Sequence, residues 1–188
     1  MLVQILSLLL GTAADLLAIA FLARVWMQWV RAPFRNPVGR FIAALTDWAL
    51  LPLRRIVPGL FGIDLAGVLA AWLVLIAYFG VMASLTGLVT VSPQAMLGVA
   101  LLAALALLRL FVYLLMGAII VAALLSWIAP YAPVAPLFNA LARPLLAPLQ
   151  RLLPPLGGID LSPLVALLLL QAALIVLAGL QPAALLLP

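Results

Sequence analysis

The stretch Pro148-Leu-Gln-Arg-Leu-Leu-Pro-Pro-Leu-Gly-Gly-Ile-Asp-Leu161, which continues into Ser162-Pro163, has a counterpart earlier in the chain. Ninety-six residues before it, Pro52-Leu-Arg-Arg-Ile-Val-Pro-Gly-Leu-Phe-Gly-Ile-Asp-Leu65 aligns without a gap, and nine of the fourteen positions are identical. Matched leucines carry little weight in a chain that is 70% hydrophobic, but Arg, Pro, Gly and Asp matched at one offset are hard to obtain by chance. The chain is therefore predicted to contain a duplicated unit.

Both copies of this stretch lie between apolar runs that are long enough to cross a bilayer core of about 30 Å. We predict an all-α, polytopic membrane protein with four transmembrane helices in two parallel repeats, each built as a span, an amphipathic surface segment and a span. The first predicted repeat is 1–91, with spans at about 2–30 and 65–85 around a surface segment at 31–61; the second is 92–188, with spans at about 105–129 and 163–181 around a surface segment at 130–158.

Prolines set the expected breaks in these segments. They interrupt both surface segments, so neither is expected to form one continuous helix, although residues 39–51 are predicted to form a short helix with an apolar face. A helix that starts after Ser92 and runs to Ala129 would be about 54 Å long. Such a helix either tilts and protrudes or lays its first part along the membrane surface. Gln181-Pro182 is expected to end the last span.

The composition excludes several classes of function. Charged residues make up 7% of the chain and the mean hydropathy is +1.44, whereas soluble domains contain about 25% charged residues. There are nine Arg and four Asp, but no Lys, Glu, His or Cys. Without His or Cys we expect no zinc, copper or iron site, no thiol chemistry and no disulfide. No metal or other cofactor is expected, and because no pair of nucleophile and base is visible, we do not expect an enzyme.

The arginines predict the orientation in the membrane. Eight of the nine lie in the surface segments or next to them, and Arg24 at the end of the first span is expected to extend its side chain to the interface. By the positive-inside rule these segments face the cytoplasm, and both termini lie on the opposite side, which in a bacterium is the periplasm. We expect the arginines to contact lipid headgroups rather than nucleic acid. The predicted headgroup contacts are Arg31, Arg35, Arg40, Arg54 and Arg143.

Several motifs resemble those of the bacterial YggT family. They are Leu22-Ala-Arg-Val-Trp-Met-Gln-Trp29, Asn36-Pro37, Gly62-Ile-Asp64 and Gly158-Ile-Asp-Leu-Ser-Pro163. The resemblance implies an inner-membrane protein of two tandem family units, associated with osmotic tolerance, membrane-complex biogenesis or cell division. Its relatives include YlmG proteins and plastid homologues linked with thylakoid and cytochrome b6 biogenesis. Ala66-Gly67 stands where the second copy has Ser162-Pro163, so the first unit is expected to be looser at its second span.

The duplicated motif has two interpretations. In the structural one, the prolines end a short helix, the glycines permit a sharp re-entry, and each Asp caps the next span. In the functional one, Arg55 and Arg151 form with the two Asp a paired polar floor that binds an ion, a lipid phosphate or a partner segment. The residues concerned are Arg55, Pro58, Gly62, Asp64, Arg151, Pro154, Gly158 and Asp160.

Asp15 and Arg109 lie inside apolar runs, where an ionisable residue costs roughly 2.5 to 3.5 kcal/mol on insertion scales. Counted from the prolines that follow each span, their depths differ by only about 4 Å. One hypothesis is that they pair across two helices and lock the units together. The alternatives are that both reach the outer headgroups, or that they belong to an ion or proton path.

These observations favour a non-catalytic scaffold or membrane-complex biogenesis factor that binds membrane lipids and a membrane-protein partner, or associates with itself. The alternative is an oligomeric channel or ion-handling protein in osmotic adaptation. The spans offer few polar groups for an aqueous pore in one monomer. The five tryptophans are expected at interfaces and in packing. Gly80 and Ser84, at a four-residue spacing, predict a close helix contact.

Overall fold

The computed structural model describes residues 1–59, 62–85, 93–152 and 160–185, with side chains to residue 180. These ranges form an all-helical fold, as predicted. The helices are α1 (Leu2–Trp29), α2 (Pro37–Leu53), α3 (Leu65–Leu85), α4 (Pro93–Ile128), α5 (Ala135–Leu152) and α6 (Ser162–Leu185). Four of them, α1, α3, α4 and α6, are long and apolar enough to cross a membrane.

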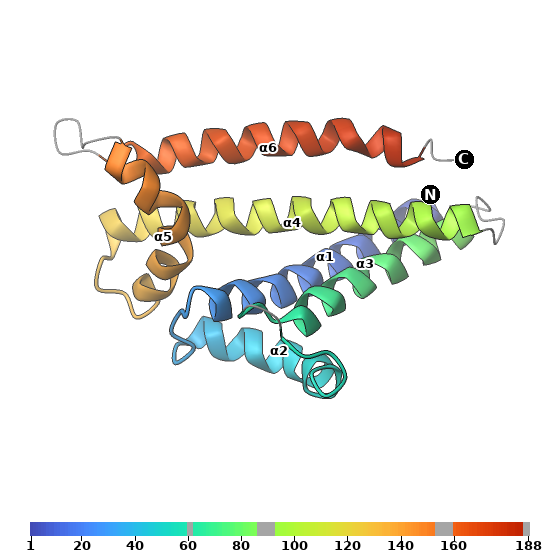
Figure 1. The fold of residues 1–188 in the computed structure, drawn as a ribbon, viewed down its shortest axis with the longest axis horizontal. Helices are drawn as coiled ribbons and strands as arrows, with labels where there is room; N and C mark the ends of the chain where they lie inside the picture. Colours follow the sequence, from blue (N-terminus) through green and yellow to red (C-terminus); the bar gives the residue numbers. More distant parts are fainter. Residues whose placement is uncertain (60–61, 86–92, 153–159, 186–188) are drawn as a thin grey trace.

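The four long helices run side by side, and the two shorter ones, α2 and α5, lie at one end of them (Figure 1). Helix α1 begins, and α6 ends, at the opposite end (Figure 1). The chain therefore places its two surface segments on the same side of the bundle, as two repeats of equal orientation require.

Helix α4 is the centre of the arrangement, since it contacts α1, α3, α5 and α6. The main core lies where α1, α3 and α4 meet, with Phe21, Leu75 and Leu110 buried there. Helix α6, in contrast, contacts only α4 and α5 within the described part of the chain. The first unit together with α4 thus forms a packed three-helix core, and α6 lies beside it.

Two predictions based on proline need correction. Helix α5 continues through Pro144 and Pro148, although the surface segment was expected to be broken. The two prolines are four residues apart, so they share one face of the helix, and both are exposed. Leu137 and Leu141 lie on that same face, seven residues before the two prolines, and are buried. Packing of the first half of α5 therefore stabilises a helix in which each proline removes one backbone donor. Helix α6 likewise extends to Leu185, past the predicted stop at Gln181-Pro182.

Helix α4 is one continuous helix of 36 residues from Pro93, and not only the span predicted at 105–129. A helix of this length was expected either to tilt and protrude or to lay its first part along the membrane surface. Because the first part of α4 continues the same helix, the structure corresponds to the first alternative.

The first unit is tighter at its second span than expected. Ala66 and Gly67 are buried, and a Cβ atom on Gly67 would collide with a γ-carbon of Val25 on α1. The small residues that replace Ser-Pro thus let α1 and α3 approach closely. Gly80, by comparison, has no atom within 4 Å of the position of a Cβ, so the close contact predicted at Gly80 and Ser84 is wrong.

Helix α1 ends in a Schellman motif. The Ala32 N–H donates to the Met27 carbonyl at 2.8 Å, and the Arg31 N–H donates to the Gln28 carbonyl at 3.1 Å. Arg31 has a φ of 53°, and it is the one non-glycine residue of the described ranges with a positive φ. Glycine usually holds this position because a Cβ strains the left-handed conformation.

We therefore expect Arg31→Gly to stabilise the protein by about 1 kcal/mol, since it removes a left-handed Cβ. Arg35→Gly is the matched control: Arg35 is another exposed arginine of the same connection without a positive φ. The measurement is thermal unfolding in a mild detergent, followed by circular dichroism. Equal midpoints for both glycine variants would contradict the prediction.

Candidate functional site

Arg24 is buried between α1 and α2. Its side chain is 9% exposed and its Nη1 atom lies 2.6 Å from a carboxylate oxygen of Asp47. The same Nη1 donates to Thr46 Oγ1 at 2.6 Å, and the Thr46 hydroxyl donates to the Ile42 carbonyl at 2.6 Å. The guanidinium of Arg24 is thus bound by Thr46 and Asp47 of α2, which the sequence did not indicate.

A second polar cluster joins three elements of the first unit. Arg54, just after α2, forms an ion pair with Asp64, just before α3, and its Nε donates to Asp64 Oδ2 at 3.1 Å. Gln28 of α1 lies against both. With its amide oriented to satisfy them, it donates to Asp64 Oδ2 at 3.1 Å and accepts from Arg54 Nη2 at 2.7 Å. We call Gln28, Arg54 and Asp64 the polar junction.

The second unit has a matching contact of different chemistry. The Gln150 amide donates to Asp160 Oδ2 at 2.8 Å, and Gln150 and Asp160 are the residues aligned with Arg54 and Asp64. The junction contact is therefore duplicated, with a cation in the first unit and a neutral amide in the second.

The paired polar floor predicted from Arg55 and Arg151 is not formed as proposed. Both are exposed, and no ion pair with either aspartate is found among the described residues. Asp64 lies ten residues after Arg54, which directly follows α2. The rotation of the chain at the end of α2 decides which of the two neighbouring arginines faces Asp64, and Arg54 is the one that does.

Of the remaining motif residues, some lie within the described ranges and some outside them. Gly62 has a φ of 80°, so the re-entry that the glycine was expected to permit is present and requires glycine. Pro58 is exposed. Pro154 and Gly158 lie outside the described residues. The headgroup arginines Arg31, Arg35, Arg40 and Arg143 are exposed, whereas Arg54 belongs to the polar junction.

Asp160 caps α6, as the structural interpretation of the motif expects. Its Oδ1 accepts from the Ser162 N–H at 2.8 Å. Partial burial acts to raise the pKa of Asp160, but the hydrogen bonds from Ser162 and Gln150 outweigh it, and the pKa is lowered from its ordinary value. The cap is therefore made by the ionised carboxylate.

This cap predicts a small loss of stability in acid. Folding lowers the pKa of Asp160, so the cap contributes its full stabilisation above the pKa that Asp160 has in the unfolded chain. The stabilisation is lost as the pH falls through the lower pKa of the folded protein. The loss is therefore expected below about pH 4. Because Asp160 is exposed, we expect a loss of about 0.5 kcal/mol relative to Asp160→Asn, which caps without titrating. Thermal unfolding of both proteins between pH 6 and pH 3 measures the difference. Parallel pH profiles would contradict the prediction.

Asp15 and Arg109 do not form an ion pair within the described chain. Both are exposed on their helices. The Arg109 Nε donates to the Tyr113 hydroxyl at 3.2 Å, and its guanidinium lies 5.5 Å from the centre of the Tyr113 ring. The predicted lock between the units is therefore not closed by a direct contact.

Two tryptophans connect the units instead. The Trp26 indole donates to the Leu141 carbonyl of α5 at 3.1 Å, and the Trp72 indole donates to the Ala100 carbonyl of α4 at 3.1 Å. Trp26 also packs edge-on against Phe111 of α4 at 5.2 Å. The sequence predicted packing for the tryptophans without indicating these partners.

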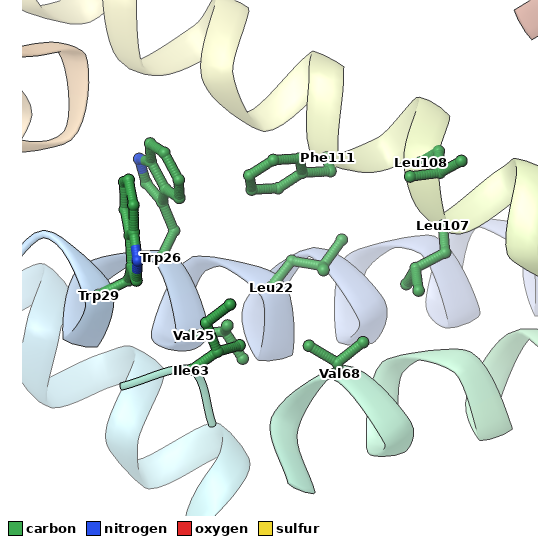
Figure 2. Close-up of a pocket in the computed structure, with 9 residues that line it drawn as sticks. All are labelled: Leu22, Val25, Trp26, Trp29, Ile63, Val68, Leu107, Leu108 and Phe111. Atoms are coloured by element: carbon green, nitrogen blue, oxygen red, sulfur yellow. The ribbon is translucent and has the colours of Figure 1, made fainter. Parts of the chain in front are cut away.

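An apolar pocket of about 360 Å³ lies where α1, the start of α3 and α4 meet. Figure 2 shows Trp26 and Trp29 at one end of it and Leu107 and Leu108 at the other. The two indole rings are stacked, with their centres 4.7 Å apart. The complete lining is Leu22, Val25, Trp26, Trp29, Ile63, Val68, Leu107, Leu108 and Phe111. We call it the aromatic pocket.

The aromatic pocket adjoins a polar pocket of about 460 Å³ that contains the polar junction. Ile63 lines both. No group of three His, Cys, Asp or Glu residues that could hold a metal ion is found in the part of the chain that the structure describes. The arrangement offers an apolar site beside a pair of opposite charges, which is suited to binding an amphipathic molecule.

Fold and site together define a polytopic helical membrane protein built from two tandem units. A family model described as CCB3/YggT matches residues 3–85 and 101–181, and the chain belongs to this family. It is 36% identical over 166 residues to "Uncharacterized protein YggT" of Escherichia coli K12, covering 88% of this chain and 85% of that protein. It is 36% identical over 168 residues to "Uncharacterized protein in proC 3'region" of Vibrio alginolyticus, covering 89% and 90%. No solved structure matches the chain.

Proposed function

We propose that this protein is a non-catalytic scaffold of the bacterial inner membrane that serves the biogenesis of a membrane complex. The observation that carries the proposal is the way α2 is fixed. Buried bonds from Arg24 tie it to α1, while Phe41 and Trp48 on its outer side are 66% and 67% exposed. A rigid helix that presents large apolar side chains at the end of a bundle is suited to binding a membrane component.

The distribution of charge supports a cytoplasmic position for this end of the bundle. Exposed arginines, among them Arg31, Arg35 and Arg40, gather on and near α2, and arginines are concentrated on the cytoplasmic side of inner-membrane proteins. In this orientation α2 and α5 lie in the cytoplasmic surface, and α1 begins and α6 ends on the periplasmic side (Figure 1).

One observation favours a second function. Asp15 and Arg109 are exposed on their helices, and an exposed charge within a span is costly in lipid. A second copy of the chain that covers them would remove this cost and place charges at an interface between protomers. This is the arrangement of an oligomeric ion-handling protein, so the experiment must distinguish the two functions.

The test is photocrosslinking in living cells from a photoreactive residue at Phe41, with a second site at Leu168 on the exposed side of α6 as the matched control. The scaffold proposal expects one membrane protein to be captured from position 41 and not from position 168. It also expects assembly of that protein's complex to fail in a deletion strain and to be restored by the wild type, but not by a Phe41→Ala, Trp48→Ala variant.

Two results would overturn the scaffold proposal. One is intact assembly in the strain that carries the double alanine variant. The other is self-crosslinking alone, combined with ion flux in proteoliposomes that Asp15→Asn abolishes, which would establish the ion-handling function.

A further inference from the structure

We propose that the protein binds one glycerophospholipid with a zwitterionic amine headgroup, phosphatidylethanolamine in a bacterial membrane, where the first unit meets α4. An acyl chain occupies the aromatic pocket, and the headgroup binds at the polar junction. This inference is independent of the scaffold function, since it concerns the contact of α1, α3 and α4 and the connection from α2 to α3, and not the exposed face of α2.

The position of the two pockets matches the shape of such a lipid. The aromatic pocket is lined by apolar side chains alone, and the polar pocket next to it holds Gln28, Arg54 and Asp64. The two share Ile63 as a common wall. Their volumes, about 360 and 460 Å³, lie within the range of small-molecule sites. A phospholipid has the same arrangement, because its apolar acyl chain is covalently connected to its polar headgroup.

The charges of the junction select the headgroup. The bonds between Arg54 and its neighbours use Nε and Nη2, and those to Asp64 use Oδ2. Within the described residues, Arg54 Nη1 and Asp64 Oδ1 therefore remain for a ligand. A phosphate accepts from the guanidinium, and an ammonium donates to the carboxylate. A headgroup that carries only negative charge would gain the first contact but meet repulsion from Asp64.

The second unit carries different residues at the positions that form the site in the first unit. Ala122 and Leu125 stand at the positions aligned with Trp26 and Trp29, and Gln150 stands at that of Arg54. The aspartate is present in both units. The two stacked indoles and the arginine thus occur together in the first unit, and the aligned positions of the second unit hold neither.

The test is native mass spectrometry of the purified full chain, titrated with phosphatidylethanolamine and with phosphatidylglycerol of identical acyl chains. We expect the wild type to bind one phosphatidylethanolamine about tenfold more tightly than phosphatidylglycerol. Arg54→Gln, which copies the second unit, should lose this preference. Arg55→Gln, a neighbouring exposed arginine without a junction contact, is the matched control and should keep it.

A second variant separates lipid binding from folding. Leu108 lines the aromatic pocket and is 51% exposed, so Leu108→Trp should fill the pocket without disturbing the core. We expect the Leu108→Trp variant to lose the bound phosphatidylethanolamine in native mass spectrometry. Its thermal unfolding midpoint, measured before lipid is added, should equal that of the wild type. Equal affinity for both lipids in the wild type, or equal losses in Arg54→Gln and Arg55→Gln, would overturn the proposal and indicate ordinary electrostatic contact with bulk lipid.

Discussion

Arg24→Ala should destabilise the protein more than the loss of any exposed arginine. The substitution removes the ion pair with Asp47 and the hydrogen bond to Thr46, and it leaves both partners on α2 without their cation. Hydrogen bonds to charged groups contribute about 1.5 to 3 kcal/mol each. Because the Asp47 side chain is 44% exposed and water replaces part of what is lost, we expect a decrease of about 2 kcal/mol in the free energy of unfolding.

The matched control is Arg40→Ala, which removes an exposed arginine from α2 itself. It should change stability by less than about 0.5 kcal/mol. Chemical unfolding in a mild detergent, followed by circular dichroism, gives both values. An Arg24→Ala, Asp47→Ala double variant should be less destabilised than the sum of the single ones, since the two residues share one contact. Additive losses would show that the ion pair contributes nothing.

Gly39→Ala should be the other strongly destabilising substitution. Gly39 lies in the first turn of α2, and an added Cβ would be 2.6 Å from the carbonyl oxygen of Phe34 and 3.0 Å from its Cα. These are backbone atoms, so no rotation of a side chain relieves the clash. The turn is also fixed by Asn36, which is buried and whose Oδ1 accepts from the Gly39 N–H at 2.9 Å.

Relief of the clash requires opening the Asn36 cap, so we expect a loss of about 3 kcal/mol from overpacking and the broken cap together. Gly80→Ala is the matched control, because a Cβ there meets no atom within 4 Å. Alanine has the higher helix propensity, so this variant should be neutral or slightly stabilising. The same unfolding measurement applies, and equal behaviour of the two alanine variants would contradict the account of Gly39.

The spans and their repeat could be predicted because they depend on local composition. A run of apolar residues of sufficient length forms a helix that crosses a membrane wherever it lies in the chain. The repeat can be found by comparing the sequence with itself, since the two copies align at an offset of 96 residues. The sharp re-entry at Gly62 was expected in one interpretation of the motif for a similar reason, since a glycine between a proline and an aspartate favours a turn locally.

The polar contacts could not be predicted because they depend on how helices face one another. Arg24 at the end of a span looks like an arginine that reaches the membrane surface, and only the approach of α2 turns Thr46 and Asp47 towards it. Identity between the two copies drew attention to Arg55 and Arg151, whereas the contact is made at the aligned pair that differs, Arg54 and Gln150. Arg54 and Gln150 make the same contact but are different residue types, so a comparison based on identical residues does not find them.

The contacts of α6 have a consequence for the order in which the chain assembles. The packed core of α1, α3 and α4 includes no residue of α6, and α6 touches only α4 and α5 of the described helices. During synthesis from the N-terminus, every helix of that core has therefore left the ribosome before α6 is complete. The last span joins a bundle that has already formed, and until it does so, one side of α4 is open to another helix in the bilayer.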